Sequence, residues 1–225
     1  MNKKESAVSP VIGVLLMLVV TIIIAAVVSG FAGGLAGSQQ KAPQASIDVK
    51  FGYGVNDDGT TATNQYDISF SHNGGDLINT KDCQLITFLT LYNGTVVKHI
   101  QSASSTVERG AYPMYSRVPH LYDNQKYAFP CDSATKVDAG YENPAWFGKA
   151  TWAPGDIART YQIRMTAAFL GLVPEASLYP GDTTAYDAGV EILRGCVENK
   201  TPVEIKMLHV PSGKYILDKT INLQG

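Results

Sequence analysis

The sequence predicts an α+β protein in which one long apolar helix precedes an antiparallel β-sandwich. First, residues 11–28 carry no charge and are apolar except at Gly13 and Thr21. Second, apolar and polar residues alternate with a period of two from Ala45 onward, which is typical of strands with one buried face. Third, turn signals separate these alternating segments. The character of the chain therefore changes near residue 40.

The apolar segment is long enough to cross a bilayer as a helix. A helix rises about 1.5 Å per residue, so roughly 20 residues cover the hydrocarbon core, and the chain from Pro10 to Gly30 supplies that length. Ser9 and Pro10 predict the helix start, because Ser caps free backbone N–H groups and Pro lacks a donor that would be unpaired there. We expect the helix to extend over residues 8–36.

The charges around the helix predict its orientation. Lys3 and Lys4 precede it, and Lys41 is the first charged residue after it. The positive-inside bias therefore places the N-terminus in the cytoplasm and the rest of the chain outside. The net charge of -2 shows no basic excess, so no nucleic-acid partner is expected.

A glycine-rich segment follows the helix. Gly30 and Gly34 have the spacing that lets membrane helices approach closely. Alternatively, these glycines fray the helix into a linker, which is favoured because polar residues and Pro43 follow at once. We expect the linker at residues 37–44 and the β domain at residues 45–225.

Two alternating segments predict the first hairpin of that domain. They are ASIDVKFGY and YDISFSH, and the residues Asn56 to Gly59 between them predict its turn. The residues expected on one face are Ile47, Val49, Phe51 and Tyr53 in the first strand and Tyr66, Ile68, Phe70 and His72 in the second.

Further strands complete the predicted sandwich. CQLITFLTL is almost continuously apolar or β-branched, which predicts a central strand, and Asn93-Gly94 turns it into TVVKHIQ. VEIKMLHV and KYILDKTINL predict a C-terminal hairpin around Pro211-Ser212-Gly213. Helical periodicity is expected after residue 40 only around Asp187 to Arg194. Short strands at these intervals predict a sandwich of the immunoglobulin-like type.

The stretch from residue 102 to residue 144 shows no clean alternation. It is rich in Tyr, Pro, Asp and Asn, and we treat it as a long insertion in the sandwich. A loop of this length is usually functional or a decoration. One interpretation is an exposed surface for adhesion or subunit contacts. The other, which is favoured, is a covered loop whose tyrosines pack.

Two residue types bear on an exported domain. Cys83, Cys131 and Cys196 are an odd set, so at most one internal disulfide forms, and the spacing does not say which. The triplets that begin at Asn93 and Asn199 both fit the N-glycosylation pattern, which has meaning only in an exported chain.

The segment AVSPVIGVLLMLVVTIIIAAVV follows a short charged leader. It resembles the N-terminus of archaeal type IV pilins, which carry a class III signal peptide. In that family a membrane-embedded prepilin peptidase removes the leader and the helix is kept. The resemblance implies that residues 1–7 are the leader and that the bond cut is Ala7-Val8 or, alternatively, Ser6-Ala7. Because no Glu occupies the fifth mature position, the charge pairing of bacterial pilins is not carried over.

The resemblance implies a structural subunit of an extracellular filament. An aliphatic helix extracted from lipid exposes its apolar surface to water. Burying that surface is favourable by about 25 cal/mol per Å², and other copies of the same helix can bury it. The implied partners are copies of the chain, the membrane, the prepilin peptidase, an assembly ATPase and a platform protein. The residues implied in the filament core are Val11, Ile12, Val14, Leu15, Leu16, Leu18, Val19, Ile22, Ile23 and Ala26.

Two later segments carry a second resemblance. ISFSHNGGD and WAPGD resemble two signatures of the β-rich C-terminal domain of archaeal pilins, a strand that ends in His-x-Gly-Gly-Asp and a Gly-Asp turn that leads into another strand. The structural turn residues implied are Gly74, Gly75, Asp76, Gly155 and Asp156.

No pattern predicts an enzyme, a cofactor or a metal site. The chain lacks G-x-S-x-G, P-loop, H-E-x-x-H and C-x-x-C motifs, and NDDGTT lacks the calcium-loop spacing. His72, Asp76, Asp156 and Asp182 would have to converge to bind a metal or act as a base. Capping of turns by the Asp side chains is favoured instead.

Two other functions are compatible with the sequence. The main alternative is a permanently anchored surface protein whose sandwich binds a ligand or a cell-surface component. An exported hydrolase is a third, weaker hypothesis. Retention of the helix in a surface filament distinguishes the pilin hypothesis from both.

Overall fold

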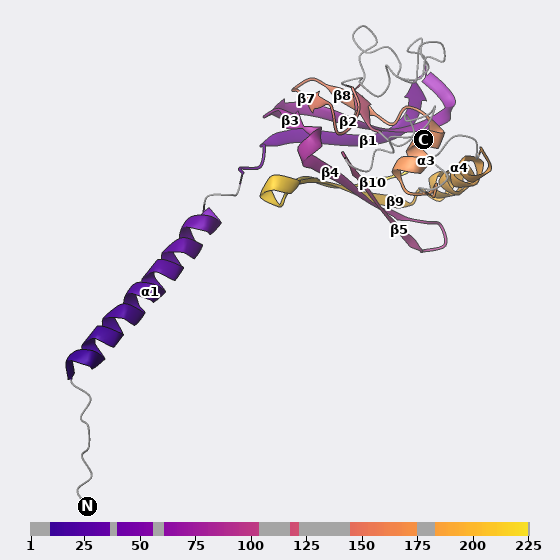
Figure 1. Cartoon of the computed structure of the whole chain (residues 1–225). Helices are drawn as coiled ribbons and strands as arrows, with labels where there is room; N and C mark the ends of the chain where they lie inside the picture. The colour runs from indigo at the N-terminus through magenta and orange to yellow at the C-terminus, as the bar shows by residue number, and fades with distance from the viewer. Residues whose placement is uncertain are drawn as a thin grey trace, which may run out of the picture. The chain divides into compact units, whose positions relative to one another are not determined.

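The computed structural model describes residues 10–36, 40–55, 61–103, 118–121, 145–174 and 183–224 (Figure 1). The chain divides into two compact units, Met1–Lys41 and Ala42–Gly225. The first contains helix α1 (Pro10–Ala36). The α+β class, an apolar helix followed by antiparallel sheets, is confirmed.

Two four-stranded antiparallel sheets form the second unit. The strand orders are β1-β2-β8-β6 and β10-β9-β4-β5, and β3 and β7 form a small additional sheet. The strands of the first sheet are β1 (Ala45–Val55), β2 (Thr61–Gly75), β8 (Ile157–Arg159) and β6 (His120–Leu121). Those of the second are β10 (Lys214–Asn222), β9 (Pro202–His209), β4 (Cys83–Thr90) and β5 (Val96–Ser102). The small sheet pairs β3 (Ile78–Asn79) with β7 (Thr151–Trp152).

The strand order is that of an immunoglobulin-like sandwich. If β1, β2, β4, β5, β6, β8, β9 and β10 are named A, B, C, C′, D, E, F and G, the two sheets read A-B-E-D and G-F-C-C′. Strand D lies inside the segment treated above as an insertion, since β6 pairs with β8. Of the rest of that segment, Ser102 ends β5, and residues 104–117 and 122–144, including Cys131, lie beyond the described residues.

The three predicted hairpins are all present. β1 pairs with β2, β4 with β5, and β10 with β9, each in the antiparallel sense. β4 is central, because β9 and β5 flank it. The predicted turn at Asn56 to Gly59 lies outside the described residues.

A single apolar core joins the two sheets. Its largest buried side chains include Phe70 of β2 and Trp152 of β7, and Leu85 and Leu89 of β4 belong to the same cluster. The Phe70 ring centroid lies 5.9 Å from those of Trp152 and Phe169. His72 continues the buried face of β2, as the alternation predicted.

Helices between β8 and β9 correct the expectation of almost no helix after residue 40. The sequence does not predict helix α3 (Ile163–Phe169). Helix α4 (Thr183–Glu198) is longer than the helix expected around Asp187 to Arg194. Its buried residues Tyr186, Val190, Leu193 and Val197 follow helical spacing. Gly189 and Gly195 obscure the pattern, yet both serve close packing.

The contacts of these two glycines explain their place in a helix. A Cβ at Gly189 would lie 2.9 Å from the Leu172 carbonyl oxygen. A Cβ at Gly195 would lie 3.0 Å from the Tyr92 ring. Helix α4 therefore approaches the segment after α3 and the β4–β5 turn more closely than larger residues allow.

Cys83 and Cys196 are free thiols, and both are buried. Burial is the main reason that the pKa of Cys83 rises to about 12, and the nearby Asp82 carboxylate adds to the effect. A buried thiol with a raised pKa is a poor nucleophile. Cys83 therefore acts as a small core side chain, and Cys196 is likewise buried in the core cluster.

Candidate functional site

Helix α1 is apolar on every side. Over Val11–Gly30 it is long and apolar enough to cross a membrane, and none of this span is buried within the chain. Thr21 is a polar residue in this span, and its hydroxyl donates to the Leu18 carbonyl oxygen at 2.8 Å. No water or external partner is therefore needed to satisfy it.

The predicted filament-core residues are all exposed along α1. Their exposed fractions run from 50 % at Ile12 to 67 % at Val14 among the large side chains, and Ala26 is exposed as well. Their apolar surface has to be covered by lipid or by other protein. The predicted cleavage residues Ser6, Ala7 and Val8, and the predicted cap Ser9, lie outside the described residues.

The start of β1 is held by a clamp, made of the backbone of Gln44 and the turn at the end of β2. The Gln44 N–H donates to Asp76 Oδ2 at 2.9 Å, and the Asp76 N–H donates to the Gln44 carbonyl oxygen at 2.8 Å. These two bonds join residues far apart in sequence. They fix the first residues of the sandwich unit, where the segment that follows α1 joins it.

Gly75 of this clamp has no room for a side chain. Its φ is +107°, in the region that favours glycine. A Cβ there would also overlap the Gln44 carbonyl oxygen. Gly74 is different, because nothing lies within 4 Å of its Cβ position.

The second signature meets the first at this clamp. The His72 N–H donates to the Asp156 carbonyl oxygen at 2.9 Å, and the Gly155 N–H donates to the His72 carbonyl oxygen at 2.7 Å. Asp156 caps its own turn, because its Oδ2 accepts from the Ala153 N–H at 2.7 Å. His72 Nε2 lies 3.1 Å from the Asp76 carbonyl oxygen. The carboxylates of Asp76 and Asp156 thus bond to backbone N–H groups.

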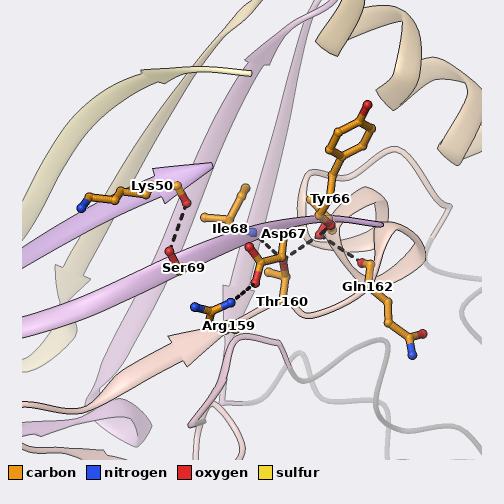
Figure 2. A network of polar contacts seen from close by, with 9 residues as sticks. Lys50, Tyr66, Asp67, Ile68, Ser69, Arg159, Thr160 and Gln162 are labelled. Atoms are coloured by element: carbon orange, nitrogen blue, oxygen red, sulfur yellow. Dashed lines mark hydrogen bonds and ion pairs between the residues drawn. The ribbon is translucent and has the colours of Figure 1, made fainter. Parts of the chain in front are cut away.

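A buried polar network, which the sequence did not indicate, joins β2 to α3 and to Thr160, the residue directly after β8 (Figure 2). The Ile68 N–H donates to Thr160 Oγ1 at 2.8 Å, and the Thr166 hydroxyl donates to the Tyr66 carbonyl oxygen at 2.7 Å. The two hydroxyls lie 2.7 Å apart. Spacing along the chain gives no signal for such a network, because its members are up to 100 residues apart.

An ion pair lies beside this network. Arg159 Nη1 donates to Asp67 Oδ2 at 3.3 Å, and the Asp67 side chain is only 3 % exposed (Figure 2). Burial raises the pKa of Asp67 to about 6, although the Arg159 guanidinium opposes the shift. Keeping the charged Asp67 carboxylate buried therefore costs desolvation free energy, which its ion pair with Arg159 offsets only in part.

The remaining predicted positions are dispersed. Asn93 and Asn199 are both exposed, on the β4–β5 turn and just after α4. Asp182 lies outside the described residues. Among the described residues, no group of three His, Cys, Asp or Glu side chains is placed to hold a metal ion.

Comparison with known proteins identifies the N-terminal segment. Residues 6–47 match the family model described as archaeal type IV pilin, N-terminal. The matched range includes α1 and the first residues of β1. No curated protein and no solved structure matches the chain. Residues 6–47 of this chain therefore match the N-terminal domain of archaeal type IV pilins.

Proposed function

We propose that the chain is a structural subunit of an archaeal type IV pilus-like extracellular filament, polymerised through α1. The family is structural rather than enzymatic and implies self-assembly into filaments, which supports a pilin-like subunit anchored in the membrane at the cell surface. The observation that carries the finer proposal is that the apolar side chains of α1 are exposed over the whole span Val11–Gly30, none of which is buried within the chain.

The chemistry of α1 suits two environments in succession. In a bilayer its backbone polar groups are satisfied within the helix and its side chains match the lipid. Outside the bilayer, each fully buried aliphatic side chain contributes about 1.5–3 kcal/mol. Copies of α1 provide an apolar surface of the same kind, so bundling replaces the lipid contacts.

We further propose that a prepilin peptidase cuts Ala7-Val8 or Ser6-Ala7. Either cut removes Lys3, Lys4 and Glu5, whose charges would otherwise lie at the end of a bundled apolar helix. Burying an unpaired charge is costly, which gives leader removal a physical purpose. A cytoplasmic ATPase and a platform protein would drive extraction, with the N-terminus inside before processing.

The clamp at Gln44 and Asp76 has a role in this scheme. The sandwich is connected to the filament core only through the segment after α1. Bonds that fix Gln44 prevent the start of β1 from peeling away from β2 when that segment is pulled. The clamp therefore marks the point at which the folded sandwich begins.

The proposal is tested by shearing filaments from the surface of the native cells. An antibody to the sandwich should label filaments in the sheared fraction by electron microscopy. In cells that lack the prepilin peptidase, the chain should stay in the membrane fraction and the labelled filaments should vanish. If normal cells contain the chain only in their membranes, the pilin hypothesis is wrong and the permanently anchored surface protein is the better explanation.

A further inference from the structure

The β4–β5 turn presents one of the two glycosylation triplets. The Leu91 N–H donates to the Thr95 carbonyl oxygen at 2.7 Å, and the Gly94 N–H donates to the Leu91 carbonyl oxygen at 2.9 Å. These bonds close a tight turn, and Gly94 takes the positive φ of +85° that it requires. Residues 92–96 are all exposed.

The side chain of Asn93 is ordered within this turn. Its Oδ1 accepts from the Thr95 N–H at 2.9 Å, which is an Asx turn. The bond uses the carbonyl oxygen of the amide. Within the described part of the chain, the Asn93 Nδ2 group makes no hydrogen bond to protein. Asn93 and Thr95 are thus held next to each other on an exposed turn with the amide nitrogen available.

The triplet at Asn199 has the opposite geometry. The Asn199 Nδ2 donates to the Gly195 carbonyl oxygen at 2.8 Å, which ties the amide to the end of α4. Thr201 is only 8 % exposed, and its N–H donates to the Cys196 carbonyl oxygen at 3.0 Å. The hydroxyl that completes this triplet is therefore out of reach in the folded domain.

We propose that Asn93, and not Asn199, accepts an N-linked oligosaccharide; this rests on the export of the sandwich in the proposed function. The donor class is an oligosaccharide linked to a polyisoprenoid phosphate. The Asn93 Nδ2 bonds to the anomeric carbon, and the bond from that carbon to the phosphate oxygen breaks. The phosphate leaves with the electron pair and takes up the proton that Nδ2 gives up.

The surroundings of the turn suit a glycan. The Tyr92 ring lies against Gly195 of α4, which anchors the turn to the rest of the domain. Tyr92 and Val96 are still 57 % and 56 % exposed. A glycan on Asn93 covers part of this apolar surface. Figure 1 shows the turn at the end of the sandwich away from the start of β1, so the glycan is clear of the clamp.

The test is peptide mass spectrometry of the chain sheared from its native cells. The peptide with Asn93 should carry a glycan mass, and the peptide with Asn199 should be unmodified. In cells that express the variants, Asn93→Gln and Thr95→Ala should reduce the glycan to background. Thr95→Ser and Asn199→Gln should keep it, because both leave an intact triplet at Asn93.

A bare Asn93 peptide, or a glycan on Asn199, overturns the proposal. The same digest contains the N-terminal peptide, which reports on the proposed function separately. A processed N-terminus with a bare Asn93 rejects the glycosylation alone. An unprocessed N-terminus with a glycan on Asn93 rejects the pilin processing alone and leaves the modification site in place.

Discussion

Helix α1 and the sandwich differ in whether their large apolar side chains are exposed or buried. Between Val11 and Val28 of α1 the large apolar side chains are 47 % to 72 % exposed, whereas Ile68, Leu85 and Leu89 of the sandwich are fully buried. The sandwich thus has an apolar core of its own. Helix α1 depends on partners outside its chain, either lipid or other helices. Assembly and domain stability should therefore respond to different substitutions.

The largest expected effect is on assembly, from a charge in the middle of α1. Val19→Asp should abolish sheared filaments, because an acidic side chain at the centre of a membrane helix costs about 2.5–3.5 kcal/mol and is no better tolerated between apolar helices. The measurement is the amount of the chain in the sheared fraction, with Val19→Leu as the matched control. Normal filaments from Val19→Asp would refute a role for α1 in the filament core.

The second prediction concerns the core of the sandwich, where a substitution should change domain stability. Phe70→Ala should lower the free energy of unfolding by about 3–5 kcal/mol, because Phe70 is 1 % exposed and packs on Trp152 and Phe169. Denaturant unfolding of the detergent-solubilised chain, followed by tryptophan fluorescence, measures it. Leu77→Ala is the control, since Leu77 is 61 % exposed and its change should stay within about 0.5 kcal/mol. Equal losses would contradict the assigned core.

The buried Asp67 should make the stability of the sandwich depend on pH. Its pKa is about 6 in the fold, above the ordinary 3.8. Between these values the unfolded chain binds fewer protons, so the free energy of unfolding falls as the pH rises from about 4 to 6. The shift corresponds to roughly 3 kcal/mol.

Asp67→Asn should remove this contribution. Denaturant unfolding of the unchanged protein and of the variant between about pH 4 and 6 measures the effect. The free energy of unfolding of the variant should rise relative to that of the unchanged protein as the pH rises. Its size at neutral pH is reduced by the loss of the bond to Arg159. A difference that does not change with pH would show that Asp67 keeps an ordinary pKa.

The smallest effect is expected at the clamp. Gly75→Ala should cost about 1–3 kcal/mol, because its φ of +107° and the overlap with the Gln44 carbonyl oxygen both oppose a Cβ. Gly74→Ala is the matched control, because its Cβ position is open. Hydrogen exchange of the Gln44 amide should accelerate in the first variant only. Unchanged exchange would indicate that the clamp does not hold the chain.

Features encoded locally could be predicted from the sequence. Helix α1 follows from an uninterrupted apolar segment after Ser9-Pro10, and the hairpins follow from alternation around turn residues such as Asn93-Gly94. The motifs predict turns at Gly75-Asp76 and Gly155-Asp156, and in the structure Gly75 ends β2 and Asp156 directly precedes β8. Their contact with each other was not predicted, because no spacing indicates that His72 meets Asp156.

Features that depend on tertiary contacts could not be predicted. Gly189 and Gly195 are unfavourable within a helix, and the close contacts that they allow α4 to make exist only in the folded domain. Helix α3 is buried on nearly every side, so it lacks the polar face that reveals helical periodicity. The pair of Asp67 and Arg159 joins positions 92 residues apart, and its partners become neighbours only when β2 meets β8.

The most direct measurement of the proposed function is the mass of the N-terminal peptide of the chain in sheared filaments. We expect it to begin at Val8 or Ala7 and to continue into an intact α1, since the helix is kept and the charged leader is lost. A peptide that still begins at Met1, or a chain that begins after residue 36, would contradict a processed pilin held in the filament by its helix.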